Sequence, residues 1–139
     1  MAIKAVNLKE MANSLESRKV ILMNGPKFHT WLHVYHNPGD HDEMHCHNAD
    51  QTFYCIDGEC TVYYKDGDKE KKDVLKPGMV ALIPGGQFYW IKNTGSSKMV
   101  LMGSRALSYE QSMKIDYTSR ENVNAHKLKE PPKATKILI

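Results

Sequence analysis

Residues 39–58 read GDHDEMHCHNADQTFYCIDG, and the fold prediction starts from this stretch. His45 and His47 are two residues apart, so on a β-strand their side chains point to the same face. The run at residues 52–56 is rich in β-branched and aromatic side chains, which favour a strand, and Asp57-Gly58 is typical of a tight hairpin turn. The stretch therefore predicts two short strands joined by a polar corner, with paired imidazoles on the first strand.

Strand patterns continue on both sides of this stretch. We expect strands at residues 18–23, 28–36, 52–57, 60–65, 72–76, 80–84, 87–93 and 98–106. Turn-forming residues separate them at spacings of about 8–12 residues, which is typical of an all-β sandwich or barrel. No helical pattern is long enough for a βαβ unit. Along residues 28–36 the side chains alternate between two faces, and we expect His29 at the surface.

Two motifs in this region resemble those of the cupin family. The first is Gly39-x5-His45-x-His47-x3-Gln51-x6-Gly58, with glutamine where the family usually has glutamate. The second is Gly78-x5-Pro84-x-Gly86-x2-Tyr89-x3-Asn93, with tyrosine where the family usually has histidine. The resemblance covers residues 31–103 and implies an all-β cupin fold, a double-stranded β-helix or jelly-roll barrel with short N- and C-terminal extensions. We expect one domain over residues 1–118 and a polar tail over residues 119–139.

In this resemblance His45, His47 and Gln51 stand at metal-ligand positions. Two imidazoles on one strand face suit a divalent transition metal such as Zn, Fe, Ni or Mn. The alternative is a barrel in which the two rings only form hydrogen bonds inside the lumen. Gln51 would offer a neutral carbonyl oxygen, which holds hard cations less strongly than a carboxylate and leaves the metal a stronger Lewis acid. Alternatively, Gln51 binds no metal and orients His47 or the substrate.

Tyr89 stands where the family's last histidine would be, and we select it as the candidate catalytic residue. A bound dication would lower the pKa of this phenol below its ordinary value of about 10, so that it could ligate the metal or act as a general acid or base. The alternative is an aromatic side chain that fills the lumen beside Phe53. We expect Trp31, His33, Tyr35 and Phe53 to contact the substrate, because aromatic and imidazole side chains on one face suit a ligand pocket.

The candidate ligand set lacks a clear carboxylate, which bears on the type of reaction. It departs from the two-histidine-one-carboxylate pattern of non-haem iron oxygenases. The leading prediction is therefore a metal-dependent small-molecule enzyme of the lyase, isomerase or cyclase type, using Lewis-acid and acid–base catalysis in the lumen. The alternatives are a non-haem metal dioxygenase and a non-catalytic cupin that binds a small ligand. The sequence indicates no substrate.

Composition limits the classes of binding partner and the cellular compartments that fit this chain. The chain has 139 residues and a net charge of +3, and its lysines are scattered, so nucleic-acid binding is not indicated. No apolar run approaches the ~20 residues of a membrane span, and residues 1–10 lack the apolar core of a signal peptide. With three cysteines and no export signal, we expect reduced thiols and a cytoplasmic location. Apolar segments at residues 3–8 and 18–23 predict a homodimer.

Overall fold

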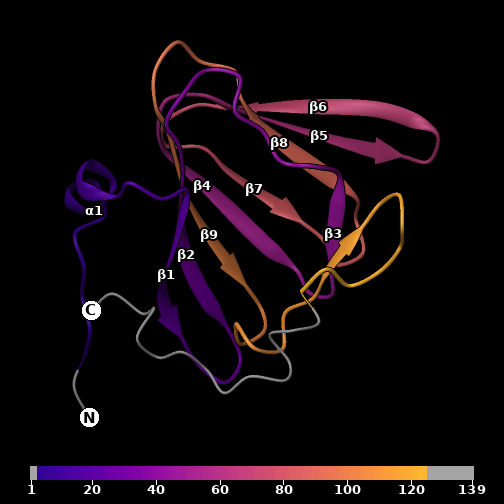
Figure 1. Ribbon diagram of the computed structural model, residues 1–139, viewed down its shortest axis with the longest axis horizontal. Helices are drawn as coiled ribbons and strands as arrows, with labels where there is room; N and C mark the ends of the chain where they lie inside the picture. Colours follow the sequence, from indigo (N-terminus) through magenta and orange to yellow (C-terminus); the bar gives the residue numbers. More distant parts are fainter. Residues whose placement is uncertain (1–2, 125–139) are drawn as a thin grey trace.

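The structure, a computed structural model, describes residues 3–124, which form one short helix and ten strands (Figure 1). In chain order these are α1 (Leu8–Ser14), β1 (Lys19–Asn24), β2 (His29–Tyr35), β3 (His45–His47), β4 (Gln51–Asp57), β5 (Cys60–Asp66), β6 (Lys69–Leu75), β7 (Val80–Ile83), β8 (Tyr89–Asn93), β9 (Met99–Arg105) and β10 (Lys114–Asp116). The predicted all-β class is confirmed, and the described part contains no helix long and apolar enough to cross a membrane.

The strands form two antiparallel five-stranded sheets. The first has the order β1-β2-β9-β4-β7 and the second the order β10-β3-β8-β5-β6. Neighbours in each sheet are mostly distant in sequence, because the chain passes repeatedly from one sheet to the other. Two such sheets packed face to face make the double-stranded β-helix, or jelly roll, that the motifs imply.

The core lies between the two sheets and comes from alternate residues of the strands. Trp31, Phe53 and Leu101 project from the first sheet, and Val62 and Ile91 project from the second. All five side chains are buried. Strict alternation places their sequence neighbours on the outer faces. One end of this interior is left open as a cavity, described below.

The helix α1 covers part of the outer face of the first sheet, beside β1 and β2 (Figure 1). It begins after Asn7, whose side-chain oxygen accepts a hydrogen bond from the Glu10 N–H at 3.0 Å and so caps the helix. Ala12 of α1 packs with Leu22 and Val34, which point away from the lumen. This second cluster explains why β2 is buried on both faces.

Gly58, the last residue of the first motif, shows why that position requires glycine. Its φ is +75°, a backbone conformation that other residues seldom adopt. A Cβ atom there would also collide with the carbonyl oxygen of Lys98. The β4–β5 turn can therefore pack closely against the start of β9.

His29 is fully buried, so its predicted surface position is wrong. It lies on the inward face of β2, where its ring stacks on Trp31 with a centroid distance of 5.1 Å. Its Nδ1–H donates to the Leu107 carbonyl oxygen at 2.8 Å, so a polar ring is accommodated in the interior. The alternation of side chains along residues 28–36 puts His29 on the same face as Trp31, which is consistent with its burial.

The expected polar tail is described only as far as residue 124. Its first residues pair with β10, because the Asp116 N–H donates to the Glu121 carbonyl at 3.0 Å and the Val123 N–H donates to the Lys114 carbonyl at 2.8 Å. The remainder of the tail lies outside the described residues.

Candidate functional site

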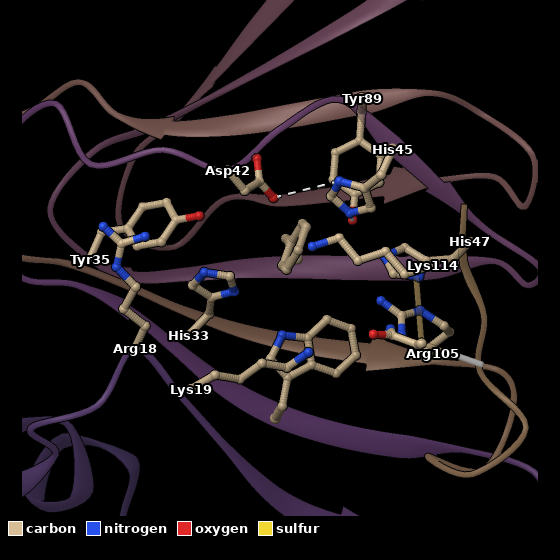
Figure 2. A pocket seen from close by; sticks show the side chains of 13 residues that line it. Arg18, Lys19, His33, Tyr35, Asp42, His45, His47, Tyr89, Arg105 and Lys114 are labelled. Atoms are coloured by element: carbon tan, nitrogen blue, oxygen red, sulfur yellow. Dashed lines mark hydrogen bonds and ion pairs between the residues drawn. The ribbon is translucent and has the colours of Figure 1, made fainter. Parts of the chain in front are cut away.

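A cavity of about 220 Å³ lies between the sheets at the β3 end of the barrel. Seven of the eight candidate site residues line it, namely Trp31, His33, Tyr35, His45, His47, Phe53 and Tyr89. Figure 2 shows these side chains converging on the cavity from both sheets. Gln51, the eighth, lies behind Tyr89 and contacts its hydroxyl.

The paired histidines lie on β3, which is held between β8 and β10. His45 pairs with Tyr89 of β8, and His47 pairs with Lys114 of β10. Nδ1 of His45 is 2.6 Å from the Glu43 carbonyl oxygen, and Nδ1 of His47 is 2.7 Å from the Met113 carbonyl oxygen. A carbonyl oxygen can only accept, so each Nδ1 carries the proton. The lone pair of each ring is therefore on Nε2.

A chain of buried hydrogen bonds connects the histidine pair to the opposite sheet. Nε2 of His45 is 3.2 Å from the Tyr89 hydroxyl, which is 2.6 Å from Nε2 of Gln51. The Gln51 oxygen accepts from Nε and Nη2 of Arg105 at 2.8 and 2.7 Å. Arginine has no acceptor, so the Gln51 oxygen must face it and the amide N–H must face Tyr89. Tyr89 therefore accepts from Gln51 and donates its own proton to His45.

Arg105 is a site residue that sequence analysis missed. Its side chain is buried, with the residue only 3% exposed, and its guanidinium lies 4.6 Å from the Trp31 ring centroid. A third hydrogen bond runs from its Nη1 to the Ser112 hydroxyl at 2.6 Å. It ends β9, outside both motifs, so only its strand parity with Leu101 could have placed it on the lumen side.

Asp42 is the second residue that sequence analysis missed. One carboxyl oxygen accepts from the Ile91 N–H at 2.7 Å, and the other lies 3.8 Å from Nδ1 of His45. Burial raises the pKa of Asp42 to about 7, against the smaller effect of the hydrogen bond from Ile91. No sequence pattern marks it, because it belongs to the irregular segment that leads into β3.

Burial also fixes the ionisation of the other groups at neutral pH. It lowers the pKa of His45 to about 4, and it lowers the pKa of His47, with a further contribution from the Arg105 charge. It raises the pKa of Tyr89 above its ordinary value. The pKa of Arg105 falls to about 10, which leaves the guanidinium charged. The histidine pair, Tyr89 and Arg105 thus provide two neutral imidazoles, a neutral phenol and one buried cation.

His45 and His47 provide two ligands for one divalent metal ion. Nε2 of each ring carries a lone pair, which in His45 accepts from the Tyr89 hydroxyl at 3.2 Å, and both rings are held by backbone carbonyls in the manner of metal-ligating histidines. The Gln51 oxygen is turned to Arg105 instead. Within residues 3–124 no group of three or more His, Cys, Asp or Glu side chains could hold a metal ion. The pair therefore fits two coordination positions, and further ligands would come from Tyr89 or a bound molecule.

The part of the chain that carries this site matches a known sequence family. A family model described as "Cupin domain" matches residues 32–103, which include both motifs. No curated protein matches the chain.

Several solved structures have similar folds. An uncharacterized conserved protein with a double-stranded β-helix domain from Klebsiella pneumoniae subsp. pneumoniae MGH 78578 has a TM-score of 0.65 at 17% identity, over 81% of this chain and 97% of that one. A protein of Thermus thermophilus has a TM-score of 0.61 at 24% identity, over 76% and 98%. A cupin superfamily protein of Desulfitobacterium hafniense DCB-2 has a TM-score of 0.59 at 16% identity, over 70% and 88%. At these identities the likeness concerns the fold alone.

Proposed function

The chain belongs to the cupin family, and on that premise we propose that it is a small-molecule enzyme of the lyase, isomerase or cyclase type, which uses acid–base chemistry in the barrel lumen. The observation that supports this most directly is the position of the Tyr89 hydroxyl. It faces the cavity and is hydrogen-bonded to His45 and Gln51 at 3.2 and 2.6 Å. A phenol in contact with the lone pair of a neutral imidazole is equipped to exchange protons.

Tyr89 would transfer the proton through this chain. Its oxygen takes a proton from a substrate atom as its own proton passes to Nε2 of His45. The resulting imidazolium is stabilised by the Asp42 carboxylate, which lies 3.8 Å from Nδ1. The proton then returns by the same route to another atom of the substrate, as an isomerisation or elimination requires. Tyr89 is again a neutral phenol between the two transfers, and the Gln51 amide, which donates to its oxygen at 2.6 Å, keeps that oxygen in position.

The test detects proton transfer whichever small molecule the protein uses. Wild-type protein and the Tyr89→Phe variant are incubated with a mixture of small metabolites in D₂O, and the products are identified by mass spectrometry. We expect a product that contains solvent deuterium, formed about 10²–10⁴-fold more slowly by Tyr89→Phe. Tyr63→Phe is the matched control, because Tyr63 stacks on Trp90 away from the cavity.

Other outcomes would overturn the proposal. If the wild type changes no metabolite, the chain is a non-catalytic binding cupin. If Tyr89→Phe reacts as fast as the wild type, Tyr89 only fills the lumen. Asp42→Asn gives an independent check, since removal of the carboxylate charge should slow a reaction that passes through the His45 imidazolium.

Metal dependence is a second candidate, favoured by the anchoring of both Nδ1 atoms on backbone carbonyls. His45 and His47 would hold Zn, Fe, Ni or Mn through Nε2. Such a metal, when bound, supplies Lewis-acid polarisation of a substrate oxygen. The site does not favour a dioxygenase of the two-histidine-one-carboxylate type, because no carboxylate completes a ligand group within the described residues.

Measurement of the bound metal tests metal dependence without an activity assay. Protein purified without a histidine tag is assayed by elemental analysis, both as isolated and after incubation with each metal. We expect about one equivalent per chain and its loss in the His45→Ala/His47→Ala double variant. Metal at background level after every incubation would remove metal dependence and leave the acid–base proposal standing.

A further inference from the structure

Arg105 carries a buried charge that the described residues do not neutralise. Its hydrogen bonds go to the Gln51 amide oxygen and the Ser112 hydroxyl, which are neutral acceptors. None of the ion pairs within residues 3–124 includes Arg105. Buried charges in proteins are usually paired, because removal of an ion from water is costly. Arg105 also lines the cavity, so a bound molecule can supply the missing negative charge.

Further cations surround the same cavity. Arg18, Lys19 and Lys114 line it together with Arg105, whereas Asp42 is its one acidic lining residue among those described. Lys19 lies over the Trp31 ring at 4.8 Å. Figure 2 shows the Lys114 side chain extending across the pocket between Asp42 and Arg105, with Lys19 lower in the view. A cavity with this excess of positive charge attracts anions.

Lys114 is a second cation at the cavity without a partner among the described residues. Its ammonium has no hydrogen bond or ion pair to any residue from 3 to 124, although the side chain is only partly exposed. Its backbone position is fixed, because β10 pairs with β3 at His47. An ammonium held over the cavity without an acceptor among residues 3–124 can bind a negatively charged ligand at the opening.

We infer that the cavity binds a small organic carboxylate, with its negative charge held between Arg105 and Lys114 and its carbon skeleton against the aromatic walls. This inference rests on the proposed use of the lumen as a small-molecule site. One carboxylate matches the single buried cation. The skeleton would contact Trp31 and Phe53, which form the apolar wall. A cavity of about 220 Å³ limits the molecule to small metabolite size, below the range of drug-sized pockets.

The inference is tested with matched pairs of molecules in which a neutral amide of similar size and shape replaces the charged carboxylate. Acetate, propionate and benzoate are compared with acetamide, propionamide and benzamide by ligand-observed NMR and calorimetry at low salt. We expect at least one carboxylate to bind about tenfold or more tightly than its amide, since a hydrogen bond to a charged group is stronger than a neutral one. Inorganic phosphate is a further probe, and it should bind less tightly than the best carboxylate because it has no skeleton for the aromatic wall.

Two variants test whether Arg105 and Lys114 cause the preference for carboxylates over amides. Gln51→Glu places a carboxylate against Arg105 in almost the same volume, so it should neutralise the guanidinium and reduce carboxylate binding at least about tenfold. Lys114→Met keeps the length of the side chain and should weaken binding by a smaller factor, because this cation is nearer to solvent. Lys71→Met is the control, since Lys71 pairs with Asp66 at 3.0 Å on the β5–β6 hairpin and does not line the cavity.

The outcomes separate this inference from the proposed function. Equal binding of acids and amides, no binding of any acid, or unchanged binding in both Gln51→Glu and Lys114→Met would overturn the carboxylate assignment. Turnover that depends on Tyr89 could then still be found. Conversely, charge-selective binding with no turnover would support the carboxylate site and refute the enzymatic proposal. Far-ultraviolet circular dichroism of each variant confirms that it is folded.

Discussion

Gln51 connects the two sheets through one side chain. It lies on β4 of the first sheet and contacts the hydroxyl of Tyr89 on β8 of the second. Its oxygen accepts two hydrogen bonds from Arg105, so its amide N–H group faces Tyr89. A glutamate there would instead neutralise Arg105. The substitution in the first motif therefore leaves a buried cation available in the lumen.

His33 permits a pH-dependent prediction for a single residue. Burial, with a smaller contribution from the Lys19 charge, lowers its pKa from the ordinary 6.5 to about 3. Between these two values the unfolded chain binds a proton on His33 that the folded protein does not bind. The free energy of unfolding should therefore fall as the pH drops from 6.5 to 3, by at most about 1.4 kcal/mol per pH unit for this group.

His33→Phe removes that contribution while it keeps a ring beside Tyr35. The difference in free energy of unfolding between His33→Phe and the wild type should shift in favour of the variant as the pH falls below the ordinary pKa of histidine. Urea unfolding at a series of pH values measures this difference. Parallel pH profiles for the two proteins would show that His33 is protonated in the folded state.

Much of the candidate site could be predicted from the sequence, but its charged groups could not. Parity along two strands placed Trp31 and Phe53 on the lumen side, and motif spacing placed Tyr89 opposite His45. Asp42 and Lys114 lie outside regular alternation, in segments that approach the cavity only through tertiary pairing. The sign of the potential in the cavity depends on such long-range contacts.

Among the strands, β9 is the central one of the first sheet and depends on Gly103. This residue pairs with Trp31 of β2 on one side and with Phe53 of β4 on the other. The absence of a side chain at Gly103 leaves room for the Trp31 ring, which meets Phe53 edge-on at 5.8 Å. The Trp31 ring in turn packs on the Arg105 guanidinium.

We expect Gly103→Ala to destabilise the protein because the added Cβ would collide with the Trp31 ring. Overpacking of this kind costs about 1–3 kcal/mol. Urea unfolding followed by circular dichroism measures the change. Ser104→Ala is the control, since this neighbour points to the outer face and should change stability by less than about 0.5 kcal/mol. A stable Gly103→Ala protein would show that Trp31 can move without loss.

The eight expected strands are confirmed with small shifts of their ends, because turn residues separate them and most combine residues that favour strands. β6 is the exception, since it begins with five charged residues and forms by pairing with β5. β10 was not predicted, since its three residues form a strand only by pairing with β3. For the helix α1, the sequence of residues 8–13 predicts only a short helical turn, and the structure has a helix over Leu8–Ser14. Its seven residues are too few for a periodic pattern, and its stability comes from packing on the sheet.

In the molecule as a whole, the outer face of the first sheet is covered unequally. The helix α1 covers the side near β1 and β2, where Val6 and Leu8 pack inward. The side near β7 is open, with Val80 62% and Leu82 66% exposed. Because β7 is also an edge strand, its backbone groups on one side are unpaired by any described strand.

The homodimer stays a prediction, and these exposures change where we expect its interface. Apart from Ile3, which is 98% exposed, the large apolar residues of segments 3–8 and 18–23 pack within the chain, as Val6, Ile21 and Leu22 show. An edge strand with exposed apolar side chains favours contact with a second copy instead. We therefore expect the two copies to meet at β7.

Multi-angle light scattering at micromolar concentration should report a dimer for the wild type. Leu82→Glu should shift the protein to the monomer, because a charge buried in an apolar interface without a partner is strongly unfavourable. Val74→Glu is the matched control, since Val74 is 39% exposed on β6 of the other sheet and should leave the mass unchanged. A wild-type monomer would refute the dimer. A dimer that persists in Leu82→Glu would place the interface away from β7, and the edge at β1 would then be the remaining edge of the same sheet.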